Sequence, residues 1–118
     1  MLPVLKYNGE QIAKNIEVAR TMFRHALGLM FRKSIPYDYS MIFILNKPSQ
    51  VSIHMLFVFF PIDVIFLNED KKIICLSRLR PWVGYKAMED IKYIIEMKAG
   101  TIEIFHLRTG GEMEFNDN

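Results

Sequence analysis

Residues 41–45 have the sequence MIFIL, a continuous apolar run closed by the polar stretch NKPS at residues 46–49. A run of this length with β-branched residues favours a strand buried on both faces of a sheet. The next apolar run, residues 51–60, predicts a second strand. It ends at Pro61, which has no N–H to donate to a central ladder. The centre of the chain is therefore predicted to be β-structure.

Strands are predicted on both sides of this centre. Before it, residues 4–7 and 11–18 form a hairpin, because the Asn8-Gly9 pair between them favours a two-residue primed turn. Residues 86–90, between the strands predicted at 72–79 and 92–97, either continue a loop or form a short turn of helix. After the centre, apolar runs bounded by turn residues predict strands at 62–67, 72–79, 92–97, 102–107 and 113–115.

The segment from Glu17 to Leu27 has a different period. Val18, Met22 and Ala26 recur every four positions and give the apolar stripe of a helix. Gly28 follows at once and can adopt the left-handed conformation that ends a helix. Eight or nine short strands and one helix near the N-terminus predict a mainly β (α+β) fold. We expect a strongly curved antiparallel or mixed sheet, or a partly closed barrel, with the helix covering one opening.

Length and composition predict a single domain over residues 1–118, with 51% hydrophobic and 24% charged residues. A net charge of +2 is too small to indicate a nucleic-acid partner. The apolar stretch 51–67 is interrupted by Pro61 and Asp63 and is shorter than the roughly 20 residues of a spanning helix. We expect no membrane partner. No secretory signal opens the chain, so we expect a cytoplasmic protein.

Motifs for catalysis and for metal or cofactor binding are missing from the sequence. Neither GxGxxG, nor the P-loop pattern, nor GxSxG occurs. The three histidines have no metal-ligand spacing, and the single cysteine excludes an internal disulfide. Cys75 lies in an apolar run and is expected to be a small buried hydrophobe. We predict no catalytic residue, no metal site and no cofactor.

Five polar or aromatic residues remain as candidates for ligand binding. Asp63 lies within an apolar strand, where a buried carboxylate needs partners; it either accepts structural hydrogen bonds or anchors a ligand at a cavity mouth. His54 is either a satisfied core residue or a general base. The Arg32 side chain either packs over core residues or forms a bidentate ion pair with Asp63 or Glu96. Trp82 either closes the core or contacts a ligand from its loop.

Several short segments occur in an order that resembles one known family. They are GLMFR at 28–32, HMLFVFFPID at 54–63, Pro81-Trp82, Ile95-Glu96 and AGTI at 99–102. The set is similar to the prokaryotic domain-of-unknown-function family 192, also called uncharacterised protein family 0127. The resemblance covers nearly the whole chain and implies a compact β-rich fold with one helix, and no established activity.

The chain departs from the family pattern at three places. Relatives often have a polar stretch, or an aromatic stretch with a basic residue, before Pro-x-Asp, whereas residues 56–60 here are entirely apolar. Lys98 stands where relatives usually have proline, and the glycine at 110–111 is doubled. Many relatives carry a signal or lipoprotein segment, and this chain resembles the form without one. The first departure weakens the expectation that this strand presents polar groups to a substrate.

Three functions are compatible with these observations. The leading hypothesis is a small non-catalytic module that binds a small molecule or a protein through Arg32, His54, Asp63, Trp82 and Glu96. The second is a hydrolase in which His54 is the base, oriented by one of the two carboxylates. The third is an interaction domain that pairs through an exposed strand edge or an apolar patch, with self-association as a weak homodimer as its first sign.

Overall fold

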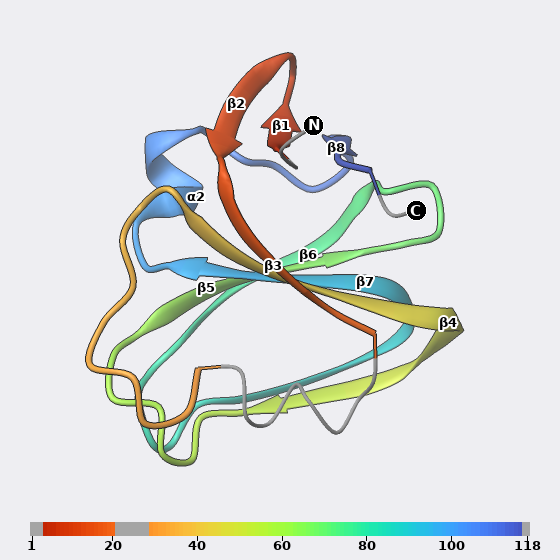
Figure 1. Cartoon of the computed structure of the whole chain (residues 1–118). Coiled ribbons are helices and arrows are strands. Elements are labelled where there is room, and N and C mark those ends of the chain that lie inside the picture. Colours follow the sequence, from red (N-terminus) through yellow and green to blue (C-terminus); the bar gives the residue numbers. More distant parts are fainter. Residues whose placement is uncertain (1–3, 21–28, 117–118) are drawn as a thin grey trace.

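The computed structural model describes residues 4–20 and 29–116 and arranges their strands in two sheets (Figure 1). One sheet has three strands in the order β2-β1-β8, and the other has five in the order β3-β4-β7-β5-β6. The elements are β1 (Leu5–Tyr7), β2 (Glu10–Ala13), β3 (Asn15–Ala19), β4 (Tyr39–His54), β5 (Ile62–Leu67), β6 (Ile73–Leu79), β7 (Tyr85–Lys98), α2 (Thr101–Ile104) and β8 (Met113–Glu114).

The predicted N-terminal hairpin is confirmed in its first half. β1 and β2 pair antiparallel across Asn8 and Gly9, which have φ values of 51° and 79°. Two positive φ values are those of a primed turn. The returning strand stops at Ala13, however, and β3 then pairs in parallel with β4 in the larger sheet. The hairpin and the large sheet are thus joined through a single residue, Lys14.

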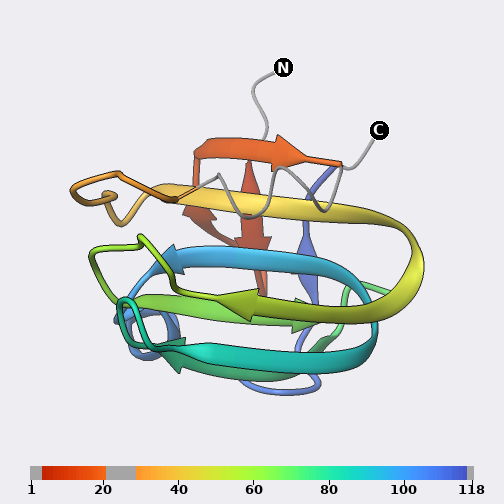
Figure 2. The ribbon, with the colours of Figure 1, turned by 90° about the horizontal axis from the view of Figure 1, so that it is seen from below.

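The ladder between β4 and β7 forms the centre of the large sheet. Residues 41–45 are all buried, as predicted, and Met41 stands opposite Glu96. The expected breaks at 46–49 and 86–90 are wrong, because both segments lie within these long strands. The register shifts between Ile44 and Val51 accommodate the polar residues as irregularities in the ladder. In Figures 1 and 2 both strands bend and return along the molecule.

The large sheet is buried on both faces at its centre. Alternate residues of β4, β5 and β7 point to opposite sides, so neighbours in sequence join different apolar clusters. Phe43, Val64 and Ile94 lie in one cluster, while Ile65 and Ile95 lie in the other with residues of β1 and β2. The three-stranded sheet therefore covers one face of the five-stranded sheet. Cys75, expected to be buried, is partly buried and packs against the first cluster.

The mainly β prediction is confirmed, but the strongly curved sheet and the partly closed barrel are wrong. Among the described residues both sheets are open, and β3 and β6 are the outer strands of the larger one. The helix is also misplaced: the described helix is α2, near the C-terminus, within a segment predicted as a strand. Residues 17–19, predicted as helix, belong to β3, and residues 21–28 lie outside the described residues, Gly28 included. Within the described ranges, no helix is long and apolar enough to cross a membrane.

Candidate binding surface

Three loops meet at one end of the molecule, the lower left in Figure 1. They comprise residues 29–36, 55–61 and 80–84. Backbone hydrogen bonds tie them together: Phe31 N donates to Phe57 O over 2.9 Å, and Trp82 N donates to Met55 O over 3.0 Å. The three loops are thus held together by backbone hydrogen bonds, in addition to any contacts between their side chains.

Four aromatic rings from these loops contact one another and form what we call the aromatic cluster: Phe31, Phe57, Phe59 and Trp82. Phe31 stacks on Phe57 with centroids 5.1 Å apart, and Trp82 lies 5.1 Å from Phe57 and 5.6 Å from Phe59. A contact of 6.4 Å between Phe31 and Phe59 closes the circuit. Each ring nevertheless keeps between 42% and 65% of its surface exposed.

The backbone of the aromatic cluster is unusual for bulky residues. Phe31, Phe57 and Trp82 have φ values of 66°, 61° and 67°. The left-handed conformation costs a side-chain-bearing residue roughly 1–2 kcal/mol, because its Cβ approaches the following carbonyl. Backbone strain of this kind is concentrated at ligand clamps and other functional positions. Three strained residues that all present exposed rings on one surface mark it as a candidate binding surface.

A close approach of backbone segments fixes the loop that carries Trp82. Gly84 N donates to Arg80 O over 3.0 Å, and Gly84 O accepts from Met55 N over 3.1 Å. A Cβ at Gly84 would lie 2.7 Å from Arg80 O and 2.9 Å from the Leu79 Cβ. Only glycine fits this contact without movement.

His54 lies at the edge of this region but has no catalytic partner. It ends β4, stands opposite Tyr85 and is exposed to solvent. Within the described ranges, neither Asp63 nor Glu96 forms a hydrogen bond or ion pair with it. The base and its orienting carboxylate, which the hydrolase hypothesis needs, are therefore not brought together.

Asp63 is fully buried and has a structural environment. Its carboxylate accepts from Arg78 Nε over 2.7 Å and Nη2 over 3.2 Å, and from the backbone amides of Gly100 and Ile102 over 3.0 and 2.9 Å. It thus holds the first turn of α2 against β5 and β6. Arg78 in turn bonds Glu103 on α2. The expected arginine partner exists, but it is Arg78 and not Arg32.

Arg32 pairs with an acidic residue on the edge strand. Its guanidinium donates to Glu17 over 2.8 Å and lies 5.2 Å from the centre of the Tyr39 ring. Burial raises the pKa of Tyr39 well above its usual range, so its phenol stays protonated. The Tyr39 hydroxyl is buried and has no hydrogen-bond partner within the described residues. Arg32 thus stabilises the edge of the sheet next to the aromatic cluster.

Glu96 is a second carboxyl group in the sheet, on the opposite face from Asp63. It is only 5% exposed and stands between Met41 and Val64 on neighbouring strands. Burial raises the pKa of its carboxyl group to about 8, and the described residues give this group no hydrogen bond or ion pair. Glu96 is therefore protonated at neutral pH, which reduces the cost of its burial.

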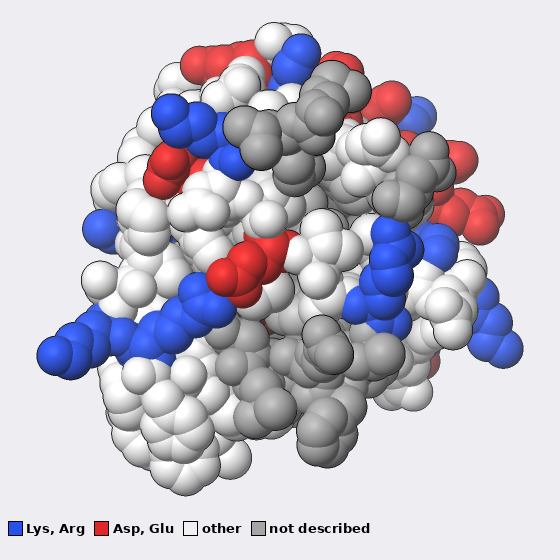
Figure 3. All heavy atoms as spheres, in the orientation of Figure 1, with Lys and Arg blue, Asp and Glu red and all other residues white. Residues whose placement is uncertain are grey.

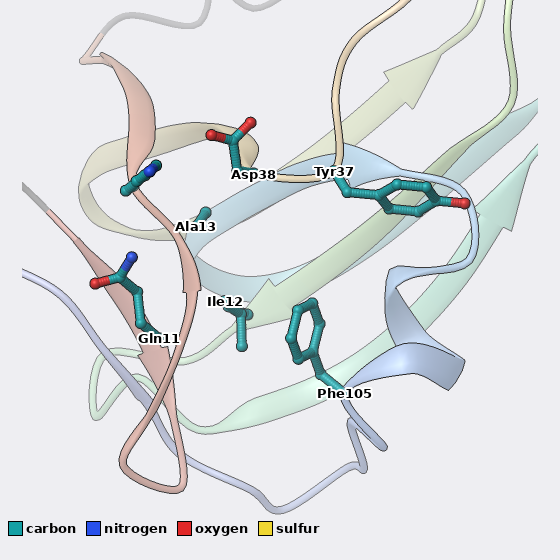
Figure 4. Close-up of a pocket in the computed structure, with 7 residues that line it drawn as sticks. Gln11, Ile12, Ala13, Tyr37, Asp38 and Phe105 are labelled. Carbon is teal, nitrogen blue, oxygen red and sulfur yellow. The ribbon is translucent and has the colours of Figure 1, made fainter.

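A shallow hollow of about 250 Å³ lies elsewhere, between β2 and the segment that precedes β4 (Figure 4). Gln11, Tyr37, Asp38 and Phe105 contribute to its lining. None of the five candidate residues does. Across the described ranges, no three His, Cys, Asp or Glu side chains are grouped so that they could hold a metal ion.

Comparison with known proteins places the chain in a family. The model of the DUF192 family, described as an uncharacterized ACR, matches residues 4–115. The chain belongs to the DUF192 family. A UPF0127 protein of Pyrococcus furiosus is 38% identical over 118 residues, covering 98% of this chain and 97% of the relative. One of Thermococcus sibiricus is 34% identical over 112 residues, covering 93% of this chain and 71% of the relative.

Two solved structures have the same fold as this DUF192 chain. A protein of unknown function from Novosphingobium aromaticivorans superimposes with a TM-score of 0.82 at 22% identity, covering 95% of this chain and 82% of that one. A Sinorhizobium meliloti protein, proposed to be a transcription regulator, also gives 0.82 at 22% identity, covering 96% and 91%. At this identity the likeness shows the fold alone.

Sequence reasoning about this DUF192 chain found Trp82 but missed its three phenylalanine neighbours. Phe57 and Phe59 were assigned to a strand, and their segment was read only as a departure from polar relatives. Residues 56–60 are entirely apolar, which favours a buried strand, so nothing in their sequence indicated an exposed loop. Phe31 gave no signal, because its partners are distant in sequence.

Proposed function

We propose that this DUF192 chain is a non-catalytic binding module and that the aromatic cluster is its contact surface. One observation carries the proposal: four mutually contacting rings remain about half exposed on a backbone that is strained at three of them. A purely structural cluster would bury its rings. A surface that must meet a partner keeps them exposed and fixed in place.

The energy available from such a surface is large. An aromatic side chain offers roughly 150–250 Å². Burying the exposed half of four rings at about 25 cal/mol per Å² gains on the order of 10 kcal/mol before the costs of association. Rings that are already fixed lose little conformational entropy on binding, and aromatic residues dominate binding hot spots for this reason.

The test is site-specific photo-crosslinking inside the cell. A photoreactive amino acid at Val83, which is 70% exposed and outside the ring contacts, samples the cluster without removing a ring. The matched control places it at Ile104 on α2, which is also exposed. We expect a discrete crosslinked partner, protein or small molecule, from position 83 and none from position 104. Identical products at both positions, or none, would refute the binding surface.

A further inference from the structure

The loops that carry the aromatic cluster hold charges of one sign, although Glu17 of β3 pairs with Arg32 beside them. Residues 29–36, 55–61 and 80–84, together with Tyr85 and Lys86 at the start of β7, contain four Lys or Arg side chains and no Asp or Glu. The rest of the chain holds 11 basic and 13 acidic residues, so the net positive charge is concentrated at this end. In Figure 3 the lower left of this face is uncharged, and basic side chains lie along its upper border, where they meet acidic atoms toward the centre.

Three of these cations are available to a partner. Arg32 is engaged by Glu17, but the side chains of Lys33, Arg80 and Lys86 form no hydrogen bond or ion pair within the described residues. Lys33 lies two positions after Phe31, Arg80 two before Trp82, and Lys86 follows the exposed Tyr85. Each loop tip therefore combines a large apolar side chain with a basic one, except 55–61, which is entirely uncharged.

A second copy of the chain is a poor occupant of this surface. In a two-fold dimer the same patch meets itself, so these cations would face like charges. The occupant must be both apolar and negatively charged. Val83, Phe31 and Leu56 are each more than half exposed and come from three separate loops. Apolar loop tips flanked by basic residues are typical of segments that enter a lipid headgroup layer. The aliphatic stems of Lys and Arg then lie along the apolar surface, and their charged ends stay among the headgroups.

We propose that the aromatic cluster docks on the surface of an anionic phospholipid membrane. This rests on the proposed binding function and names its partner, and it departs from the expectation that no membrane is involved. The rings and aliphatic tips enter the interfacial layer, where aromatic side chains are favoured. Lys33, Arg80 and Lys86 meet the anionic headgroups. The chain is peripheral in this arrangement and spans nothing.

The experiment uses the tryptophan as its own reporter. Trp82 is the single tryptophan of the chain, so its fluorescence reports on the cluster alone. Purified protein is mixed with vesicles of phosphatidylcholine plus phosphatidylglycerol, or of phosphatidylcholine alone. We expect a blue shift and co-flotation with the anionic vesicles, both weakened by added salt, and little effect with the neutral ones.

The variants are placed outside the ring contacts, so that a loss of binding does not reflect a loss of the fold. Arg80→Gln with Lys86→Gln should weaken binding to anionic vesicles about 30-fold, given what each basic residue contributes near such a surface. Leu56→Ser with Val83→Ser should abolish the blue shift. Ile104→Ser should bind as the wild type does.

Absence of binding to anionic vesicles, or binding unaffected by both double variants, would overturn the lipid proposal. If crosslinks from position 83 to a protein persist in that case, the binding function stands with a protein partner. If they are also absent, both proposals fail.

Discussion

Phe31 and Phe57 are joined twice, through their backbones and through their rings. The amide of Phe31 donates to the carbonyl of Phe57 over 2.9 Å, and the two rings stack 5.1 Å apart. Both residues have positive φ. The stacking therefore depends on a backbone conformation that phenylalanine disfavours, and the surrounding loops must supply the energy that maintains it.

Substitution of Phe57 tests this strain directly. Phe57→Ala and Phe57→Gly both remove the ring, but only glycine adopts positive φ without a steric penalty. We expect the glycine variant to be more stable than the alanine variant by about 1 kcal/mol in urea unfolding. At Phe59, whose φ is not positive, the order should reverse. Equal stability of the two Phe57 variants would show that the backbone is not strained there.

Gly84→Ala should disturb the aromatic cluster from outside it. The new Cβ would lie 2.7 Å from Arg80 O, so the loop that carries Trp82 must shift. We expect a loss of stability of about 1–3 kcal/mol, as for overpacked sites, and a change in Trp82 emission. Gly110→Ala is the control, since a Cβ there meets nothing within 4 Å although φ is +87°. It should cost stability and leave the emission unchanged.

Local patterns predicted the elements that local chemistry determines. The apolar run 41–45 and the Asn8-Gly9 turn are both found as expected. Residues 102–107 were predicted as a strand from their apolar content. The first turn of α2 forms there because the Asp63 carboxylate accepts hydrogen bonds from the backbone amides of Gly100 and Ile102. These residues lie 37 and 39 positions from Asp63 in the sequence. A contact at that separation leaves no periodic signal.

The same limit applies to the candidate residues. Arg32 was expected to pair with Asp63 or Glu96, whereas Glu17 reaches it because β3 lies parallel to β4 at the sheet edge. The sequence pattern predicts a helix that starts at Glu17, within this strand. The aromatic cluster needed three loops to be placed together, and only Trp82 stood out alone. Ligand binding by Arg32, His54, Asp63, Trp82 and Glu96 stays a prediction.

Asp63→Asn should destabilise the fold. The carboxylate is fully buried and accepts four hydrogen bonds, two of them from Arg78. An amide has one acceptor oxygen and turns two N–H donors toward other donors. We expect a loss of about 3–5 kcal/mol, as when a buried charge loses its partner, measured by urea unfolding. Glu103→Gln, which removes only the exposed partner of Arg78, should leave stability nearly unchanged. A cooperative, fully stable Asp63→Asn protein would instead return Asp63 to the functional candidates.

The stability of the chain should fall as the pH rises from about 5 to 8 because of Glu96. Burial raises the pKa of this carboxyl from 4.5 to about 8 in the folded state. Below 4.5 both states hold the proton, and the group is neutral in each. Between the two values the unfolded chain releases the proton and the folded chain keeps it, so the free energy of unfolding decreases by about 1.4 kcal/mol per pH unit. Above 8 the contribution no longer changes.

Glu96→Gln separates this effect from all other titrating groups. Glutamine has the same shape and never ionises, so the variant should lack this contribution to the pH dependence. We expect the difference in unfolding free energy between the two proteins to grow from pH 5 to pH 8 in favour of the variant, and then to level off. Urea unfolding at a series of pH values measures it. A difference that does not change with pH would mean that Glu96 ionises normally in the folded chain, and that its burial is compensated by a partner or by water.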